Sequence, residues 1–261
     1  MRIRLLGLLF SLGFNDLAVA FEPADYLIVD LSHAYGDSTI YWPTSPTSFR
    51  KDVLAYGDTE QGYFYSAYSV CTPEHGGTHI DAPVHFAKGG LSTDELAVAD
   101  LVAPAVVIDV SAKAAEDPTY RLTVADVTQF ERSHGEISAG AIVLLRTDWS
   151  ARWPDALDYL GDDTPGDASN LKFPGFGAAA TRLLVEERAV GMLGIDTASV
   201  DYGPSQDFIA HQIGAAQGIP NLENLTNLAA LPATGSVVMA LPMKIEGGSG
   251  GPVRVIALVP L

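Results

Sequence analysis

Six short runs of mostly apolar residues constrain this 261-residue chain more than any other feature. Several of the runs are continuous instead of alternating between apolar and polar residues, which is typical of strands covered on both faces of a sheet. The pattern therefore predicts a sheet with both faces buried. The runs are residues 26–31, 105–110, 141–145, 190–195, 237–241 and 253–259.

Two segments between these runs predict helices. Thr123 is a suitable N-cap for the first, whose apolar residues share one face and which Gly135 would close. The second covers residues 178–188. The mixture of strands and helices predicts an α/β fold with a single domain over residues 21–261. The Asp-, Gly- and Pro-rich segment 153–174 is expected to be a loop within that domain.

The N-terminus has the pattern of an export signal. Arg2 and Arg4 provide a positive start, residues 5–14 are apolar, and Ala18-Val19-Ala20 matches an A-x-A cleavage site. The apolar stretch is too short to span a bilayer. We therefore expect residues 1–20 to be a signal peptide, and the mature chain to be exported, to a periplasm, without a membrane span. The alternative is an ordinary apolar N-terminal segment of a cytoplasmic protein.

Charge and cysteine content exclude several classes of function. The formal net charge is −17, from 32 acidic and 15 basic residues. Such a chain repels phosphate backbones and anionic lipid head groups, which argues against nucleic-acid or membrane-surface partners. The single cysteine, Cys71, excludes an internal disulfide and a cysteine-rich zinc site. Its strand-like flanks predict a small buried residue.

Side chains suited to metal binding or proton transfer are most concentrated in residues 75–86, which contain three of the six histidines. If this segment is extended, His75, His79 and Asp81 point to one face, with space left at Gly77 for a metal ion. Two imidazoles and a carboxylate suit zinc, manganese or iron and leave positions open for water. The sequence therefore predicts a metal site here.

A further histidine follows closely. Pro83 would end the strand and turn the chain, which brings His85 back toward the predicted site. A histidine that is not itself a metal ligand is suited to act as a general acid or base near neutral pH. His85 is therefore the candidate catalytic residue.

The segment His-Gly-Gly-Thr-His-Ile-Asp-Ala-Pro-Val-His-Phe resembles the signature of the cyclase family, whose members are metal-dependent hydrolases of compounds such as isatin and N-formylkynurenine. Weaker matches cover most of the remaining chain. They lie at residues 30–33, 41–43, 194–201, 211, 223–225 and 247–254.

The resemblance implies a swivelling β/β/α fold, assembled as a homodimer or larger oligomer, with Mn²⁺ or Zn²⁺ as the cofactor. It implies His75, His79 and Asp81 as ligands of a first metal ion. In members that bind two ions, Asp81, His211 and Glu223 would hold the second. Residues 207–216 could form a helix that presents His211, with Glu223 returning from the following turn. His85 takes the proton-transfer role.

Three aromatic residues, Trp42, Phe64 and Tyr65, could line a pocket for a planar aryl amide. The resemblance implies hydrolysis of a C–N amide bond. The Asp-, Gly- and Pro-rich segment and the closing Gly-rich hairpin look closer to the members that hydrolyse isatin, so ring opening of isatin to isatinate is favoured over deformylation of N-formylkynurenine. Ester or lactone hydrolysis ranks third. A secreted metal-binding protein without catalysis is the alternative of another class, and it leaves His85 and the aromatic residues without a role.

Overall fold

In the computed structural model, the chain is described from residue 22 to residue 261. The expected signal peptide, residues 1–20, lies outside the described residues. Across residues 22–261, no helix combines the length and apolar character needed to cross a membrane.

Eight strands form one sheet in the order β1-β12-β11-β5-β7-β9-β10-β4, and an additional pairing of β12 with β4 makes the sheet barrel-like. The neighbours β5, β7, β9 and β10 run parallel, and the other pairs are antiparallel. All six predicted strands are present in this sheet, with ends shifted by up to three residues. The strands are β1 (Tyr26–Asp30), β4 (His79–Asp81), β5 (Val102–Asp109), β7 (Ile142–Arg146), β9 (Met192–Ile195), β10 (Asn221–Glu223), β11 (Ser236–Pro242) and β12 (Gly250–Pro260).

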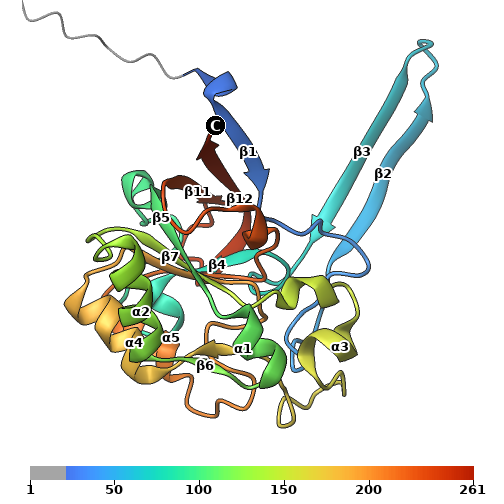
Figure 1. Cartoon of the computed structure of the whole chain (residues 1–261). Helices are drawn as coiled ribbons and strands as arrows, with labels where there is room; N and C mark the ends of the chain where they lie inside the picture. The colour runs from blue at the N-terminus through green and yellow to red at the C-terminus, as the bar shows by residue number, and fades with distance from the viewer. Residues whose placement is uncertain (1–21) are drawn as a thin grey trace, which may run out of the picture.

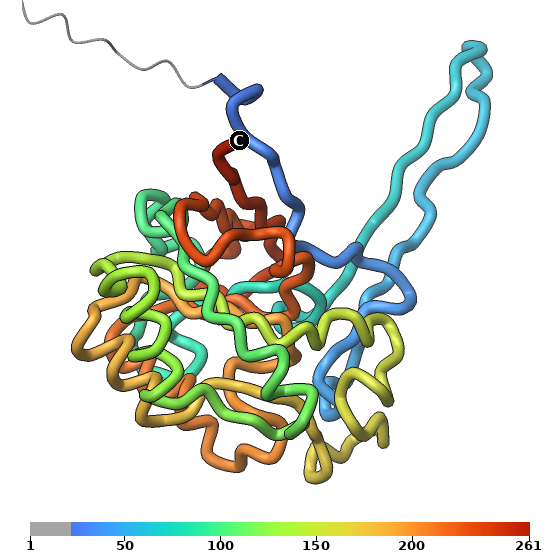
Figure 2. The backbone as a smooth tube through the Cα atoms, in the orientation of Figure 1, coloured from blue at the N-terminus to red at the C-terminus, as the bar shows by residue number. Residues whose placement is uncertain are grey.

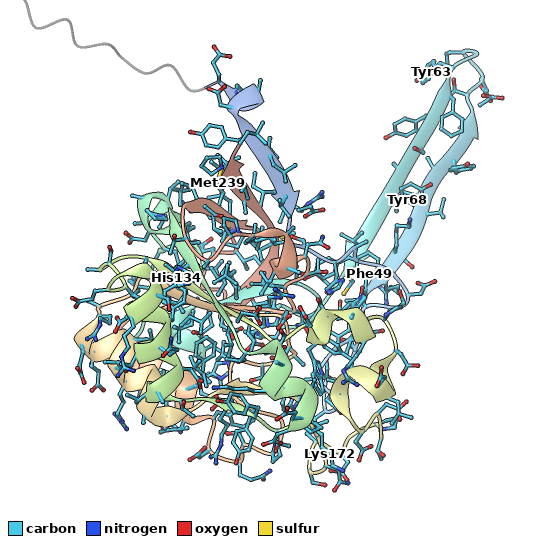
Figure 3. All side chains as sticks on the ribbon, in the orientation of Figure 1. Phe49, Tyr63, Tyr68, His134, Lys172 and Met239 are labelled. Atoms are coloured by element: carbon cyan, nitrogen blue, oxygen red, sulfur yellow. The ribbon has the colours of Figure 1, made fainter. Side chains whose placement is uncertain are left out.

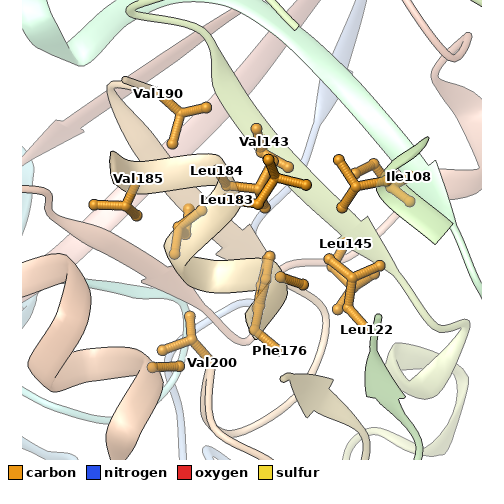
Figure 4. Close-up of a cluster of buried hydrophobic side chains, with 14 of the residues drawn as sticks. Ile108, Leu122, Val143, Leu145, Phe176, Leu183, Leu184, Val185, Val190 and Val200 are labelled. Atoms are coloured by element: carbon orange, nitrogen blue, oxygen red, sulfur yellow. The ribbon is translucent and has the colours of Figure 1, made fainter. Parts of the chain in front are cut away.

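Strand β7 shows why the predicted runs are continuously apolar. Its residues Ile142 and Leu144 face the core inside the barrel-like sheet. Val143 and Leu145 point the opposite way, into a second core between the sheet and the helices (Figure 4). All four side chains are fully buried. Since both faces are covered, every position of the strand must be apolar.

Helices α2, α4 and α5 gather on one side of the sheet (Figure 1). Helix α2 begins and ends as predicted: Thr123 accepts from the Asp126 amide while Asp126 accepts from the Thr123 amide, and Gly135 follows the last turn with φ 92°. The predicted second helix is also present, although its last turn is a π-helix, Leu183–Glu187. The α-helices are α1 (Ser111–Glu116), α2 (Val124–His134), α3 (Ala156–Leu160), α4 (Ala178–Arg182) and α5 (Ile209–Ala216).

The segment predicted as a loop between the strands contains the short helix α3 and is anchored by buried aromatic residues. Tyr159 and Phe173 are fully buried, and Trp149 donates its indole N–H to the Tyr159 carbonyl at 2.7 Å. This third core includes Ile40 and packs against Trp42. The segment therefore supports one wall of the pocket described below. Two short strands, β6 (Arg121–Leu122) and β8 (Gly175–Phe176), pair nearby.

Strands β2 (Arg50–Asp58) and β3 (Phe64–Cys71) pair only with each other, among the described strands, and form a hairpin that extends away from the body of the protein (Figures 1 and 2). In Figure 3, Tyr63 lies at the tip of this hairpin and Tyr68 lies between the tip and the base. The prediction that Cys71 is buried is wrong: Cys71 is exposed, because its strand packs against no second layer.

Candidate metal centre

The three-residue strand β4 carries two of the predicted ligands, His79 and Asp81, into the interior. It lies between β10 and β12, with Glu223 opposite His79 in the β10 register and Gly250 opposite Asp81 in the β12 register. His79, Asp81 and Glu223 are each at most 5% exposed. The pairing therefore brings residues about 140 positions apart to a single buried point.

The expectation of an extended segment from His75 onward is wrong. Gly76 and Gly77 have φ 140° and 58°, so the chain bends there and the strand begins only at His79. A Cβ on Gly77 would lie 2.7 Å from Cζ of Tyr35. Gly77 is thus required by the bend and by the Tyr35 ring, and not by space for a metal ion as predicted.

His211 approaches the same point from helix α5, as predicted, while Glu223 comes from strand β10 instead of a turn. Nε2 of His211 lies 3.1 Å from Asp81 Oδ2 and 3.0 Å from Glu223 Oε1. On the other side of Asp81, Oδ1 lies 2.7 Å from His75 Nδ1 and 3.2 Å from His79 Nε2. Asp81 is therefore the central ligand candidate.

Two sets of donor atoms result, and within each set the atoms lie within 4.8 Å of one another. We call them the first set and the second set. The first set is His75, His79 and Asp81; the second set is Asp81, His211 and Glu223. All five residues predicted as ligands are thus brought together.

Each histidine of the two sets has its outward nitrogen bound to the protein. His79 Nδ1 lies 3.0 Å from the Gly77 carbonyl oxygen, and His211 Nδ1 lies 2.7 Å from Asp201 Oδ2. Both acceptors require the proton on Nδ1, so the neutral ring has its lone pair on Nε2, facing the carboxylates.

His75 has the opposite orientation. Its Nε2 lies 2.9 Å from Ser249 Oγ, and that hydroxyl donates to Glu74 at 2.6 Å. With its proton committed to Glu74, the hydroxyl accepts from His75 Nε2, which leaves the bare Nδ1 facing Asp81. Nitrogen lone pairs that face buried carboxylates need either protons or a cation between them, and the donor set fits a divalent metal ion.

The pKa values of these residues also indicate that the buried carboxylates are stabilised by nearby positive charge. Burial acts to lower the pKa of His79, but Asp81 and Glu223 outweigh it and raise the pKa to about 9. Burial likewise acts against the charged form of His211, yet Asp201, Asp81 and Glu223 raise its pKa well above the usual value. The pKa of Asp81 lies well below its usual range, because the adjacent imidazoles outweigh its burial. Without a metal ion, protons on the histidines must balance the carboxylates.

A pocket of about 280 Å³ opens onto both sets. Its lining is mostly apolar and includes Trp42, as predicted, together with Phe86 and Phe208, which the sequence did not single out. His85 also lines it, at the end of the short 3₁₀ turn that Pro83 begins. The pocket therefore combines an apolar wall with a row of polar ligand atoms, the usual composition of a small-molecule site.

Phe64 and Tyr65, which were predicted to line this pocket, are not among the residues of the chain that line it. Both residues lie at the start of β3 in the extended hairpin, where they are 56% and 52% exposed. The hairpin that carries them extends away from the body of the protein (Figure 1).

The fold and the site define a family of metal-binding α/β proteins, and the comparisons with known proteins identify it. The model of the Cyclase family, described as "Putative cyclase", matches residues 29–202. The chain belongs to this family.

The chain is similar to two kinds of hydrolase. The chain is 38% identical over 208 residues to isatin hydrolase of Roseibium aggregatum, covering 76% of this chain and 77% of the relative. It is 30% identical over 229 residues to kynurenine formamidase of Salinibacter ruber, covering 88% and 96%. Among solved structures, isatin hydrolase A from Labrenzia aggregata bound to benzyl benzoate superposes with a TM-score of 0.84 at 34% identity, covering 91% and 95%.

Proposed function

We propose that this protein is a metal-dependent amidohydrolase that opens the five-membered ring of isatin to isatinate. The observation that carries the proposal is that two aromatic rings, Trp42 and Phe208, with centroids 6.0 Å apart, line the same pocket as the metal-ligand sets. A planar aryl amide can pack against such rings with its carbonyl toward the ligands. The similarity to proteins named isatin hydrolase supports this substrate.

His75, His79 and Asp81 would hold the first metal ion, either Mn²⁺ or Zn²⁺, and the second set would hold another. When bound, such an ion supplies Lewis acidity and activates water at neutral pH. The apolar wall orients the substrate ring and limits the access of bulk water. His85, whose pKa is lowered to about 4 chiefly by burial, is neutral at pH 7 and can accept a proton and deliver it to the leaving nitrogen.

Deformylation of N-formylkynurenine is the second candidate, because named kynurenine formamidases align over most of their length. It breaks the same kind of bond with the same residues. The two candidates differ in the substrate: isatin is a compact fused ring, whereas N-formylkynurenine carries a flexible amino-acid chain that must also be accommodated.

The test is hydrolysis of isatin and N-formylkynurenine, followed by absorbance, with protein stripped of metal and then reconstituted with Mn²⁺ or Zn²⁺. Metal-dependent loss of isatin in excess of deformylation is the expected result, and His79→Ala is the control that should bind little metal and remain inactive. The reverse preference would identify a formamidase. Activity on lactones alone, or metal binding with no hydrolysis at all, would overturn the amide assignment.

We further propose that the β2–β3 hairpin associates with a second copy of the chain. It exposes eight large apolar residues between positions 53 and 70. If each loses on the order of 100 Å² of exposed surface on binding, the total approaches the roughly 800 Å² per partner of a stable interface. An isolated two-stranded hairpin is also only marginally stable in water, so a partner would stabilise it.

We also propose that the protein is exported to a periplasm. It rests on the pattern of Arg2, Arg4 and Ala18-Val19-Ala20. Fractionation of cells that express the complete chain, with N-terminal sequencing of the product, tests it. A mature product beginning at Phe21 outside the cytoplasm is expected, and an uncleaved cytoplasmic product would contradict it.

A further inference from the structure

Asp201 is a buried carboxylate, 1% exposed, that lies just outside the two ligand sets and accepts hydrogen bonds from the first turn of helix α5. Its Oδ1 accepts from the amide of Ala210 at 2.9 Å. Its Oδ2 accepts both from the amide of His211 at 3.1 Å and from Nδ1 of the same histidine at 2.7 Å. Backbone and ring of a single residue are therefore held by one carboxylate oxygen.

An ionised carboxylate only accepts hydrogen bonds, so the contact with Asp201 fixes the proton of His211 on Nδ1. The hydrogen bonds from the backbone amides also fix the orientation of the Asp201 carboxylate, because they hold it at the N-terminal end of α5, the helix that carries His211. With the proton on Nδ1, the lone pair on Nε2 faces Asp81 and Glu223 at 3.1 and 3.0 Å.

The other two histidines are held differently. The partner of His79 is a backbone carbonyl, and the partner of His75 is the hydroxyl of Ser249. Among the described residues, only His211 of these three has a carboxylate at its outward nitrogen. A negative charge there increases the electron density of the ring and so strengthens its bond to a cation.

We infer that Asp201 is a positioning residue that holds His211 in the Nδ1-protonated form, so that the second set can bind a divalent cation. The inference rests on the proposed metal centre but not on the identity of the substrate. Asp201 itself contacts neither the metal ion nor the reacting atoms, and it acts only through His211.

The primary test is Asp201→Asn in the complete protein, with zinc as the probe. The amide keeps the size of the side chain, and its oxygen can still accept from the helix. If the amide nitrogen of the new side chain faces His211, it donates to Nδ1 of His211, and the proton of the His211 ring moves to Nε2. Zinc affinity of the second set, measured by competition with a chromophoric chelator, should fall about 10- to 100-fold.

Two control variants separate positioning from support of the helix end. Gln212→Ala removes the side-chain amide that donates to the Asp207 carbonyl just before helix α5, without removing a hydrogen bond of Asp201 or His211. It should lower the Tm while zinc affinity stays within twofold of wild type. Ser249→Ala should weaken the first set and spare the second, the converse of Asp201→Asn.

The tautomer can also be read directly, which keeps the inference testable if Asp201→Asn does not fold. Long-range ¹H–¹⁵N NMR of the zinc-loaded wild type should show His211 protonated at Nδ1 and zinc-bound at Nε2, with the signal assigned by its loss in His211→Gln. A proton on Nε2 would overturn the inference. So would unchanged zinc affinity in Asp201→Asn, or an equal loss in Gln212→Ala. Wild-type protein that binds no zinc would instead remove the metal centre itself, and this inference with it.

Discussion

The ring of His85 lies against the ring of His75, with centroids 3.8 Å apart and planes 19° from parallel. His75 belongs to the first ligand set, whereas His85 belongs to neither set. Within residues 22–261, neither ring nitrogen of His85 has a hydrogen-bonding partner. The stacking therefore places a free, neutral imidazole next to the ligands, where a substrate in the pocket would meet it.

Replacing His85 by alanine should separate catalysis from metal binding. We expect kcat for isatin to fall by about 10²- to 10⁴-fold, because proton transfer by a positioned side chain contributes that much. Metal content, measured by elemental analysis, should remain close to wild type. A variant that lost its metal and regained full specific activity on reconstitution would show that His85 supports the ligands instead of moving protons.

Much of this site could be predicted from sequence, because the ligands His75, His79 and Asp81 lie within seven residues of one another. The adjacent strand pairing was not predictable: β4 and β10 have three residues each, too few to show a periodic pattern. Helix α2, by contrast, carries its own start and stop in Thr123 and Gly135, and was predicted to the residue.

Residues that act across long sequence distances were missed for a physical reason. Ser249 contacts His75 from 174 positions away, and a lone serine in a glycine-rich stretch has no local signal. Phe64 and Tyr65 were assigned to the pocket from residue type alone. Residue type reports a preference for apolar surroundings, but it does not report which surface supplies them.

Gly77→Ala should damage the metal site more than an ordinary glycine substitution. The new Cβ would lie 2.7 Å from the Tyr35 ring, in backbone with φ 58°. We expect the free energy of unfolding to fall by about 2–4 kcal/mol and zinc affinity to weaken, because the Gly77 carbonyl orients His79. Gly140→Ala is the matched control: its φ is 76° but nothing lies within 4 Å, so only about 1 kcal/mol should be lost. Equal losses in chemical denaturation would rule out the contact with Tyr35.

Phe64→Asp should weaken self-association through the hairpin. Phe64 is 56% exposed and packs edge-on against Tyr56, with ring centroids 5.3 Å apart. A charge placed there opposes burial at an interface. Light scattering coupled to size-exclusion chromatography should show a smaller molar mass for Phe64→Asp than for the wild type at the same concentration. Leu157→Asp, at a 55% exposed position of α3, should leave the mass unchanged. A wild type that is already monomeric at micromolar concentration would refute the proposed interface.

The buried carboxyl group of Asp196 should make the free energy of unfolding depend on pH. It is 1% exposed, and burial raises its pKa to about 7 from 3.8, although hydrogen bonds from Thr147 oppose the shift. Between pH 4 and 7 the folded protein keeps this proton while the unfolded chain has released it. Rising pH therefore favours unfolding, by roughly 4 kcal/mol over that interval for this residue, and the effect levels off above pH 7.

Asp196→Asn removes this titration and keeps an oxygen that can accept from Thr147. We expect the variant to gain stability relative to wild type as the pH rises from 4 to 7, with the difference constant above pH 7. Denaturant unfolding at several pH values measures it, and subtracting the wild-type curve removes the contribution of the other groups. Asp163→Asn, at an exposed position, should give a flat difference. A flat difference for Asp196→Asn as well would mean that Asp196 is already ionised in the folded protein at pH 4, stabilised by the hydrogen bonds from Thr147 despite its burial.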